Sequence, residues 1–211
     1  MDAIRIETGR NPEAAIIWLH GLGADGHDFE PIVPELGLDK PVRFVFPHAP
    51  IRAVTINQGM RMRAWYDILQ LGGGPEDEAG LRASQKLTEE LIREQGLPAN
   101  RIVLAGFSQG GAIALLTGLH YPERLAAIMA LSTYLPLAGK LAAERSEANR
   151  DVPLFMAHGR YDDLIPLGRA QASRDALKAL GYSIEWHDYP MPHSVCAPEI
   201  ADVSAFLSRV L

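Results

Sequence analysis

Short runs of continuous apolar residues alternate with longer amphipathic segments along the whole chain, and this alternation restricts the folds open to it. A run without polar residues is typical of a strand that is covered on both faces. Such strands are predicted at 14–19, 42–46, 101–105, 125–131 and 152–157, with a more alternating strand, nearer a sheet edge, at 182–189. Helical spacing predicts helices over 78–95, 111–119, 167–180 and 197–211. Strands that alternate with helices in this way favour the α/β class, with a mostly parallel sheet flanked by helices.

Length and composition fit one globular domain over residues 1–211. A chain of this size buries about 70% of the surface that it exposes when unfolded, which is enough for a complete hydrophobic core. The 47% apolar and 22% charged residues are ordinary for a globular protein and exclude disordered or collagen-like chains. The region 47–75 shows neither a strand nor a helix pattern, and its aromatic and apolar residues favour a functional loop.

Charge and cysteine content limit the expected partners and location. The net charge of −6 provides no long-range attraction for nucleic acid or an anionic membrane, so we expect neither as a partner. Cys196 is the only cysteine, which excludes an intrachain disulfide and favours a reducing cytoplasm. No secretory signal is evident at the start of the chain, and the apolar stretch 110–119 is too short to span a bilayer. The sequence does not decide whether the protein forms a homodimer.

The segment 102–112 indicates a catalytic nucleophile. An apolar run leads into Gly106-Phe107-Ser108-Gln109-Gly110, and an apolar helix follows. A serine on a tight strand-to-helix turn projects its hydroxyl above the sheet, and glycines two positions before and after it avoid collisions across the turn. The helix behind the turn points backbone N–H groups at the reaction centre. We therefore predict Ser108 as the nucleophile, against the alternative of a glycine-rich turn with an incidental serine.

A serine nucleophile needs a base, and the base needs an acid that holds its tautomer. In this fold class the order along the chain is serine, then aspartate or glutamate, then histidine. His193 lies in a proline-rich loop between the last predicted strand and helix, where loops at the carboxyl ends of strands build a site, so it is preferred over His158 and His187. Asp162 and Asp163 both follow an earlier strand, and position alone does not separate them.

Acyl transfer also needs two N–H donors aimed at the developing oxyanion. The backbone N–H of Gln109, next to the nucleophile, is one candidate, and Leu22 in the glycine-rich segment 20–26 is the other. The same segment is weakly suggestive of phosphate binding, but it lacks the lysine of a P-loop and the G-x-G-x-x-G pattern.

Taken together, these segments resemble the carboxylesterase and acyl-protein thioesterase family of small serine α/β-hydrolases. The resemblance extends from residue 16 to 211 and rests on Leu19-His20-Gly21-Leu22-Gly23, Val54-Thr55 with Asn57 and Gly59, Trp65-Tyr66-Asp67, Gly106 to Gly111, His158-Gly159 with Asp162, and Pro190 to His193. It implies an α/β-hydrolase fold without a large lid domain. It also implies Ser108, Asp162 and His193 as the catalytic residues, Leu22 and Gln109 as oxyanion donors, and no metal or cofactor.

The resemblance further implies an acyl groove built from the Trp65 loop and from the segment after Asp162. The predicted substrate-binding residues are Trp65, Ile68, Leu69, Leu71, Leu164 and Ile165. Two departures affect this groove: Arg63-Ala64 stands where the family usually has Pro-Ser, and the loop after Asp67 contains Gly72-Gly73-Gly74. A preference for acyl chain length is therefore not carried over.

The predicted function is a serine carboxylesterase that hydrolyses short- to medium-chain esters through an acyl-enzyme. The alternative is a thioesterase acting on acylated protein or acyl-CoA. From other classes, a noncatalytic binding module with this fold and a metal hydrolase stay open, the latter through His20 with His27 or His187 with His193. Neither histidine pair has the His-x-x-x-His spacing with a nearby acid.

Overall fold

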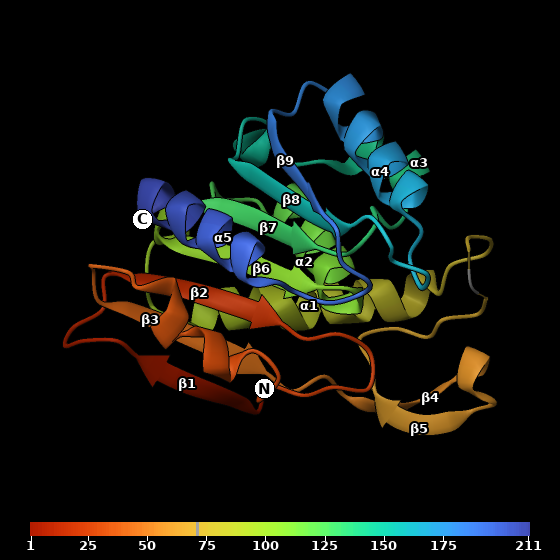
Figure 1. The fold of residues 1–211 in the computed structure, drawn as a ribbon, viewed down its shortest axis with the longest axis horizontal. Coiled ribbons are helices and arrows are strands. Elements are labelled where there is room, and N and C mark those ends of the chain that lie inside the picture. Colours follow the sequence, from red (N-terminus) through yellow and green to blue (C-terminus); the bar gives the residue numbers. More distant parts are fainter. Residues whose placement is uncertain (71) are drawn as a thin grey trace.

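A twisted seven-stranded sheet forms the centre of the computed structural model, which describes residues 1–70 and 72–211 (Figure 1). The strands are β1 (Ala3–Glu7), β2 (Ala14–Leu19), β3 (Val42–Pro47), β6 (Ile102–Phe107), β7 (Ala127–Leu131), β8 (Leu154–Gly159) and β9 (Ile184–Tyr189). Their spatial order is β1-β3-β2-β6-β7-β8-β9, and only β1 runs antiparallel to its neighbour. The mostly parallel α/β sheet is confirmed, and β9 lies at its edge as predicted.

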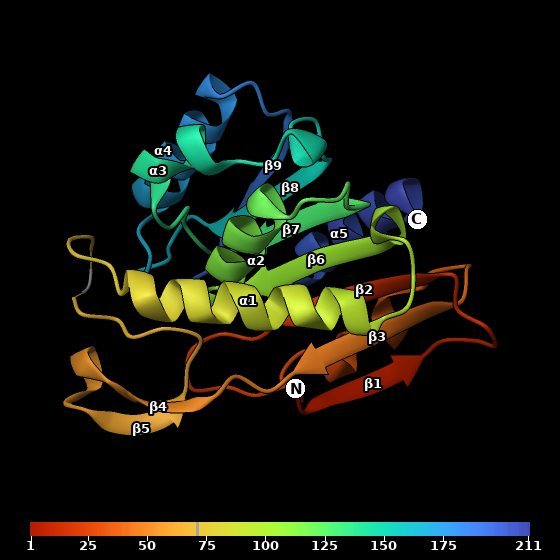
Figure 2. The same ribbon diagram turned by 180° about the vertical axis from the view of Figure 1, so that it is seen from behind.

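Helices cover both faces of the sheet because its central strands are apolar on both sides. The helices are α1 (Glu78–Glu94), α2 (Gln109–His120), α3 (Ala138–Glu144), α4 (Leu167–Ala179) and α5 (Ala197–Val210). Side chains of α1, α2, α3 and α4 join one buried cluster, and those of α5 join a second one. The ribbon shows α1 and α5 on opposite faces of the sheet (Figures 1 and 2). Helix α2 is buried along nearly its whole length, as its continuous apolar sequence predicts.

Two strands of a hairpin, an edge strand and a short α-helix were not predicted. Strand β1 is a short edge strand with mixed exposure, α3 has only seven residues, and the region 47–75 contains an antiparallel hairpin of β4 (Ile51–Val54) and β5 (Met60–Arg63). The prediction that 47–75 is wholly irregular is therefore wrong. Short 3-10 helices complete the structure: η1 (Glu30–Ile32), η2 (Pro34–Leu36), η3 (Thr55–Asn57), η4 (Ala99–Arg101) and η5 (Glu147–Asn149).

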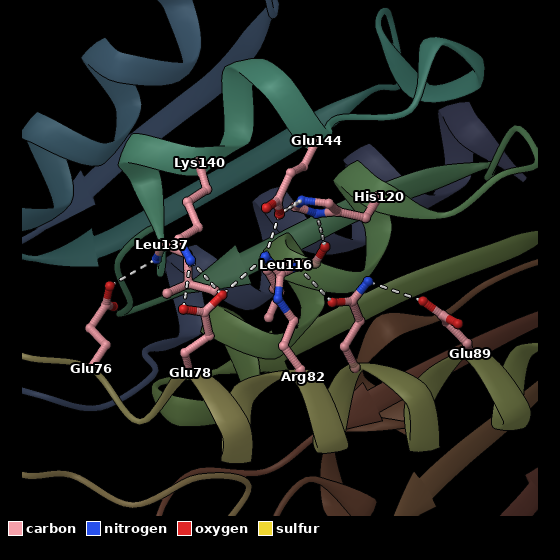
Figure 3. A network of polar contacts seen from close by, with 10 residues as sticks. Glu76, Glu78, Arg82, Glu89, Leu116, His120, Leu137, Lys140 and Glu144 are labelled. Atoms are coloured by element: carbon pink, nitrogen blue, oxygen red, sulfur yellow. Dashed lines mark hydrogen bonds and ion pairs between the residues drawn. The ribbon is translucent and has the colours of Figure 1, made fainter.

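Ion pairs and hydrogen bonds connect the segment that carries α3 to the N-terminal half of α1 and to Glu76 just before it (Figure 3). Lys140 Nζ lies 2.6 Å from Glu78 Oε2, Arg82 pairs with Glu144, and the backbone N–H of Leu137 donates to Glu76 Oε2 at 3.0 Å. Each exposed pair contributes little by itself. As a set they restrain the loop between β7 and α3, which lies beside the candidate site.

Within the described part of the chain, no helix has both the length and the apolar character needed to cross a bilayer.

Candidate active site

Ser108 occupies a strained turn between the central strand β6 and helix α2. Its backbone has φ +54° and ψ −120°, outside the conformations that a serine ordinarily adopts. Neighbouring glycines make the turn feasible, because a Cβ on Gly106 would lie 2.6 Å from the Gly111 nitrogen and one on Gly110 would lie 2.6 Å from the His20 carbonyl oxygen. Hydrogen bonds from Ser108 N to Leu131 O (2.8 Å) and from Thr133 Oγ1 to Ser108 O (2.6 Å) hold the strained residue in place.

The loops after β8 and β9 bring an imidazole and a carboxylate to this serine. His193 Nε2 lies 2.9 Å from Ser108 Oγ, and His193 Nδ1 lies 2.6 Å from Asp162 Oδ2. The other carboxylate oxygen of Asp162 accepts hydrogen bonds from the backbone N–H groups of Leu164 (3.0 Å) and Ile165 (2.8 Å). The serine, imidazole and carboxylate thus form one hydrogen-bonded chain, in which the carboxylate is buried and fixed.

The geometry separates the two acid candidates and the other histidines. Asp163 is exposed, while Asp162 meets the imidazole of His193. His158 is buried and bonds through Nε2 to the Ile165 carbonyl oxygen at 2.8 Å, so it supports the loop that holds Asp162. Burial lowers the pKa of His158, which favours a neutral ring in this position. His187 stays on β9, bonded to Glu185 at 3.2 Å.

The two residues predicted as oxyanion donors lie on the segments that flank the serine turn. Gln109 begins α2, and the first N–H groups of a helix have no acceptor within it. Leu22 lies in the loop after β2, which packs so closely on the serine turn that a Cβ on Gly21 would lie 3.5 Å from Ser108 Cβ. Both residues line the cavity at the serine, and neither backbone N–H has an acceptor among the described residues.

Side chains behind the cavity hold these two loops together. The Gln109 side chain accepts a hydrogen bond from Trp65 N (2.7 Å) and donates one to Tyr66 O (2.7 Å), while Trp65 Nε1 donates to His20 O at 2.9 Å. His20 Nε2 accepts from Ala49 N at 3.0 Å, which leaves Nδ1 as the donor toward Gly21 O at 2.7 Å. Burial lowers the pKa of His20, in agreement with a neutral ring.

A cavity of about 470 Å³ opens at Ser108. Of the residues predicted for an acyl groove, Ile68, Leu164 and Ile165 line it. Trp65 and Leu69 do not: Trp65 is fully buried, its ring N–H bonded to the His20 carbonyl oxygen, and Leu69 is 39% exposed and is not among the residues that line the cavity. Leu71 lies outside the described residues.

The cavity also has walls that sequence reasoning missed. Aromatic, polar and charged residues contribute to them: Asp28, Ile56, Asn57, Tyr66, Gln70, Phe107, Tyr134 and Arg169. Tyr66 belongs to the motif Trp65-Tyr66-Asp67, so the sequence already pointed to this part of the wall. Tyr134 and Arg169 stand in no motif and come from segments on either side of β8, so only the tertiary structure brings them to the cavity.

A serine on the turn after the central strand of such a sheet, with an imidazole in reach of its hydroxyl, defines a serine hydrolase of the α/β-hydrolase class, which cleaves ester or thioester bonds. The comparisons with known proteins narrow this class. The family model described as phospholipase/carboxylesterase matches residues 1–211, and the chain belongs to that family.

Individual relatives cover nearly all of the chain. Acyl-protein thioesterase 1 of Mycosarcoma maydis is 42% identical over 230 residues, which cover 99% of this chain and 95% of the relative. Acyl-protein thioesterase 1 of Gibberella zeae is 41% identical, with 94% and 91% covered. Among solved structures, SOBER1 of Arabidopsis thaliana matches with a TM-score of 0.89 at 30% identity, covering 93% of this chain and 98% of that one. Acyl-protein thioesterase 2 of Zea mays matches with a TM-score of 0.86 at 28% identity, covering 99% of both chains.

Proposed function

We propose that this serine hydrolase is a thioesterase that removes acyl groups from proteins. The observation that carries the proposal is the 42% identity to an acyl-protein thioesterase over almost the full length of both chains. The relatives thus favour the thioester alternative of the sequence analysis over its main prediction, a carboxylesterase for small oxyesters.

The proposed mechanism is acyl transfer in two steps. His193 Nε2 takes the proton of Ser108 Oγ, 2.9 Å away, as the oxygen attacks the thioester carbonyl carbon. The backbone N–H groups of Leu22 and Gln109 bind the oxyanion of the tetrahedral intermediate. Its collapse breaks the carbon–sulfur bond, and the imidazolium returns its proton to the leaving thiolate. The acyl group remains on Ser108 as an ester.

Water completes the reaction. His193 removes a proton from a water molecule that attacks the acyl-enzyme carbonyl, and the imidazolium then protonates Ser108 Oγ as the carboxylic acid leaves. Asp162 accepts a hydrogen bond from Nδ1 of the ring throughout, which keeps Nε2 free for proton transfer and stabilises the imidazolium. The apolar side chains of Ile68, Leu164 and Ile165 are proposed to contact the acyl chain.

The test compares a thioester and an oxyester that share one acyl chain and one peptide. We expect a higher kcat/KM for the S-acylated cysteine peptide than for the O-acylated serine peptide, and loss of both activities in Ser108→Ala. Ser208→Ala, which removes a hydroxyl exposed on α5, serves as the control and should retain them. Equal or faster turnover of the oxyester would support the second candidate, a carboxylesterase, which the likeness to the esterase PE8 favours (26% identity, TM-score 0.85). Activity that survives in Ser108→Ala would refute the proposed nucleophile.

We further propose a cytoplasmic location for the protein, on the ground of its single cysteine. The organisation as one domain over 1–211 and the homodimer also stay predictions. Fractionation of cells and sedimentation of the purified protein test the location and the oligomeric state.

A further inference from the structure

One wall of the cavity at Ser108 carries a guanidinium group. Arg169, in the first turn of α4, lines the cavity together with Ser108, His193 and Tyr134. Its Cζ lies 3.5 Å from the centroid of the Tyr134 ring, and the hydroxyl of Tyr134 is 2.9 Å from that of Tyr66. The guanidinium is therefore stacked on an aromatic ring that is itself hydrogen-bonded to a buried neighbour.

Hydrogen bonds fix the backbone of Arg169 within α4 and connect this helix to the loop that carries Tyr134. Arg169 N donates to Pro166 O at 2.8 Å, and Arg169 O accepts from Ser173 Oγ at 2.9 Å. Ser173 Oγ in turn accepts from Leu135 N at 2.9 Å, which joins α4 to the loop that carries Tyr134. That loop is restrained by the contacts of Figure 3. The position of Arg169 is thus coupled to the fold rather than to a free loop.

Within the described ranges 1–70 and 72–211, the charge of Arg169 has no ion-pair partner. Among the residues that the structure describes, no carboxylate forms an ion pair with its guanidinium, although most other arginines make one. Glu76 lines a second cavity together with Tyr134 and Arg169, but its carboxylate lies beyond the 4.0 Å ion-pair distance from the guanidinium and accepts the Leu137 N–H at 3.0 Å. Asp28, the acidic residue that lines the cavity, belongs to the loop after β2, and burial raises its pKa. On a chain with net charge −6, an unpaired cation in the substrate cavity is conspicuous.

Guanidinium groups match carboxylate and phosphate groups, because their planar fork of N–H donors can bind two oxygens at once. We propose that Arg169 is a specificity-determining residue that binds a negatively charged group, a carboxylate or a phosphate, on the acylated substrate. This inference rests on the proposed hydrolase function and adds a charge requirement to its substrate class. The competing explanation is that Arg169 only packs on Tyr134 as a cation–π contact.

The experiment uses two pairs of thioesters, which distinguish the source of the charge. In the first pair, a six-carbon acyl chain ends either in a methyl group or in a carboxylate. In the second, the acyl chain is neutral and the cysteine peptide carries either glutamate or glutamine next to the cysteine. The variants are Arg169→Gln, Arg169→Lys and, as the control, Arg174→Gln, which removes an arginine of the same helix that pairs with Asp175 and packs on Trp186.

For the wild type we expect a higher kcat/KM for the charged member of at least one pair. In Arg169→Gln the ratio of charged to neutral kcat/KM should fall by about tenfold or more, mainly through KM, since hydrogen bonds to charged groups are the strong ones. Arg169→Lys should lie in between, because it keeps the charge without the fork. Arg174→Gln should leave the ratio unchanged.

A measurement on the wild type keeps the proposal testable if a variant fails to fold. If Arg169 recognises charge, the ratio of charged to neutral kcat/KM should fall as NaCl is raised, because salt screens the attraction. The inference would be overturned if the ratio of charged to neutral kcat/KM were the same in wild type and Arg169→Gln for both pairs, or if it did not change with salt. In that outcome the wild type would still hydrolyse the neutral thioesters, so the proposed function would stand. If the wild type does not hydrolyse the neutral thioesters at all, the proposed function is refuted, and the inference with it.

Discussion

Asp162 Oδ2 lies 2.6 Å from His193 Nδ1, whereas the neighbouring carboxylate of Asp163 is exposed. Two adjacent residues of identical chemistry therefore occupy different environments. The backbone decides between them, because the N–H groups of Leu164 and Ile165 bind Asp162 Oδ1 and orient its second oxygen toward the ring.

This difference predicts unequal effects of two matched substitutions. Asp162→Asn replaces the acceptor that fixes the ring tautomer, and we expect kcat to fall by roughly 10⁴-fold with little change in KM. Asp163→Asn should change kcat by less than about twofold, as expected for an exposed side chain away from the ring. Steady-state kinetics on one thioester checks both. Similar losses in the two variants would mean that the hydrogen-bonded chain is not what supports catalysis.

The local patterns of the chain were sufficient for every strand of the seven-stranded sheet except β1, and for the serine turn. The strand, the glycines and the buried helix around Ser108 are consecutive in the sequence, so their periodicity and spacing report directly on the structure. His193 could be found because the loops at the carboxyl ends of parallel strands meet at one edge.

Other features depend on contacts that no local pattern reports. Strand β1 is a half-exposed edge strand, and the hairpin β4–β5 contains arginines and exposed side chains, so neither has the apolar signature of a buried strand. The pairing of Tyr134 with Arg169 joins positions 35 residues apart through the packing of α4. Trp65 was expected beside the substrate, but its indole N–H finds an acceptor in the buried His20 carbonyl instead.

The Gln109 side chain is predicted to contribute to stability, separately from the backbone N–H of the same residue. Gln109→Ala would leave Trp65 N and Tyr66 O without their buried partners, and each such group costs about 1–3 kcal/mol of unfolding free energy. Urea unfolding measures the loss. Gln85→Ala, whose side chain contacts Arg82 and Glu89 on the surface of α1, is the control and should change stability by less than about 0.5 kcal/mol. Equal stabilities of the two variants would contradict the bridging role.

Gly159 is predicted to control the position of the loop that carries His193. A Cβ at this position would lie 2.5 Å from Met191 O and would also collide with Pro192 O, so Gly159→Ala must shift the backbone at 191–192 relative to position 159 and is expected to carry His193 with it. A shift of about 1 Å can cost on the order of 10²-fold in rate. We therefore expect kcat to fall by about that factor.

The control for this substitution is Gly139→Ala in α3, where a new Cβ meets nothing within 4 Å. It should keep full kcat and raise the helix stability by up to about 1 kcal/mol. Steady-state kinetics together with thermal unfolding separates a displaced loop from general destabilisation. Unchanged kcat in Gly159→Ala would show that the loop can relax without moving the imidazole.

Glu199 should make the protein less stable as the pH rises from 4.5 to about 8. Its side chain is fully buried in the first turn of α5, and neither carboxyl oxygen has a hydrogen-bond partner among the described residues. Burial raises the pKa of Glu199 from 4.5 to about 8, against a smaller lowering by the Cys196 backbone N–H and with a small addition from the charge of Asp202. Between these two values the folded state holds a proton that the unfolded state has lost. The free energy of unfolding must therefore decrease as the pH rises through that window.

Glu199→Gln removes the titration while keeping the shape of the side chain. Near pH 4.5 the carboxyl of the folded wild type is still protonated, so the variant and the wild type should have similar free energies of unfolding. From there up to pH 8 the free energy of unfolding of the wild type should fall relative to that of the variant, which thereby gains an advantage. Each unit of the pKa shift is worth about 1.4 kcal/mol, so the advantage should reach several times that value. Urea unfolding at pH 5, 7 and 9 measures it, with the exposed Glu35→Gln as the control. If the stability of Glu199→Gln runs parallel to that of the wild type across this range, the carboxyl is ionised in the folded protein and must have a partner there.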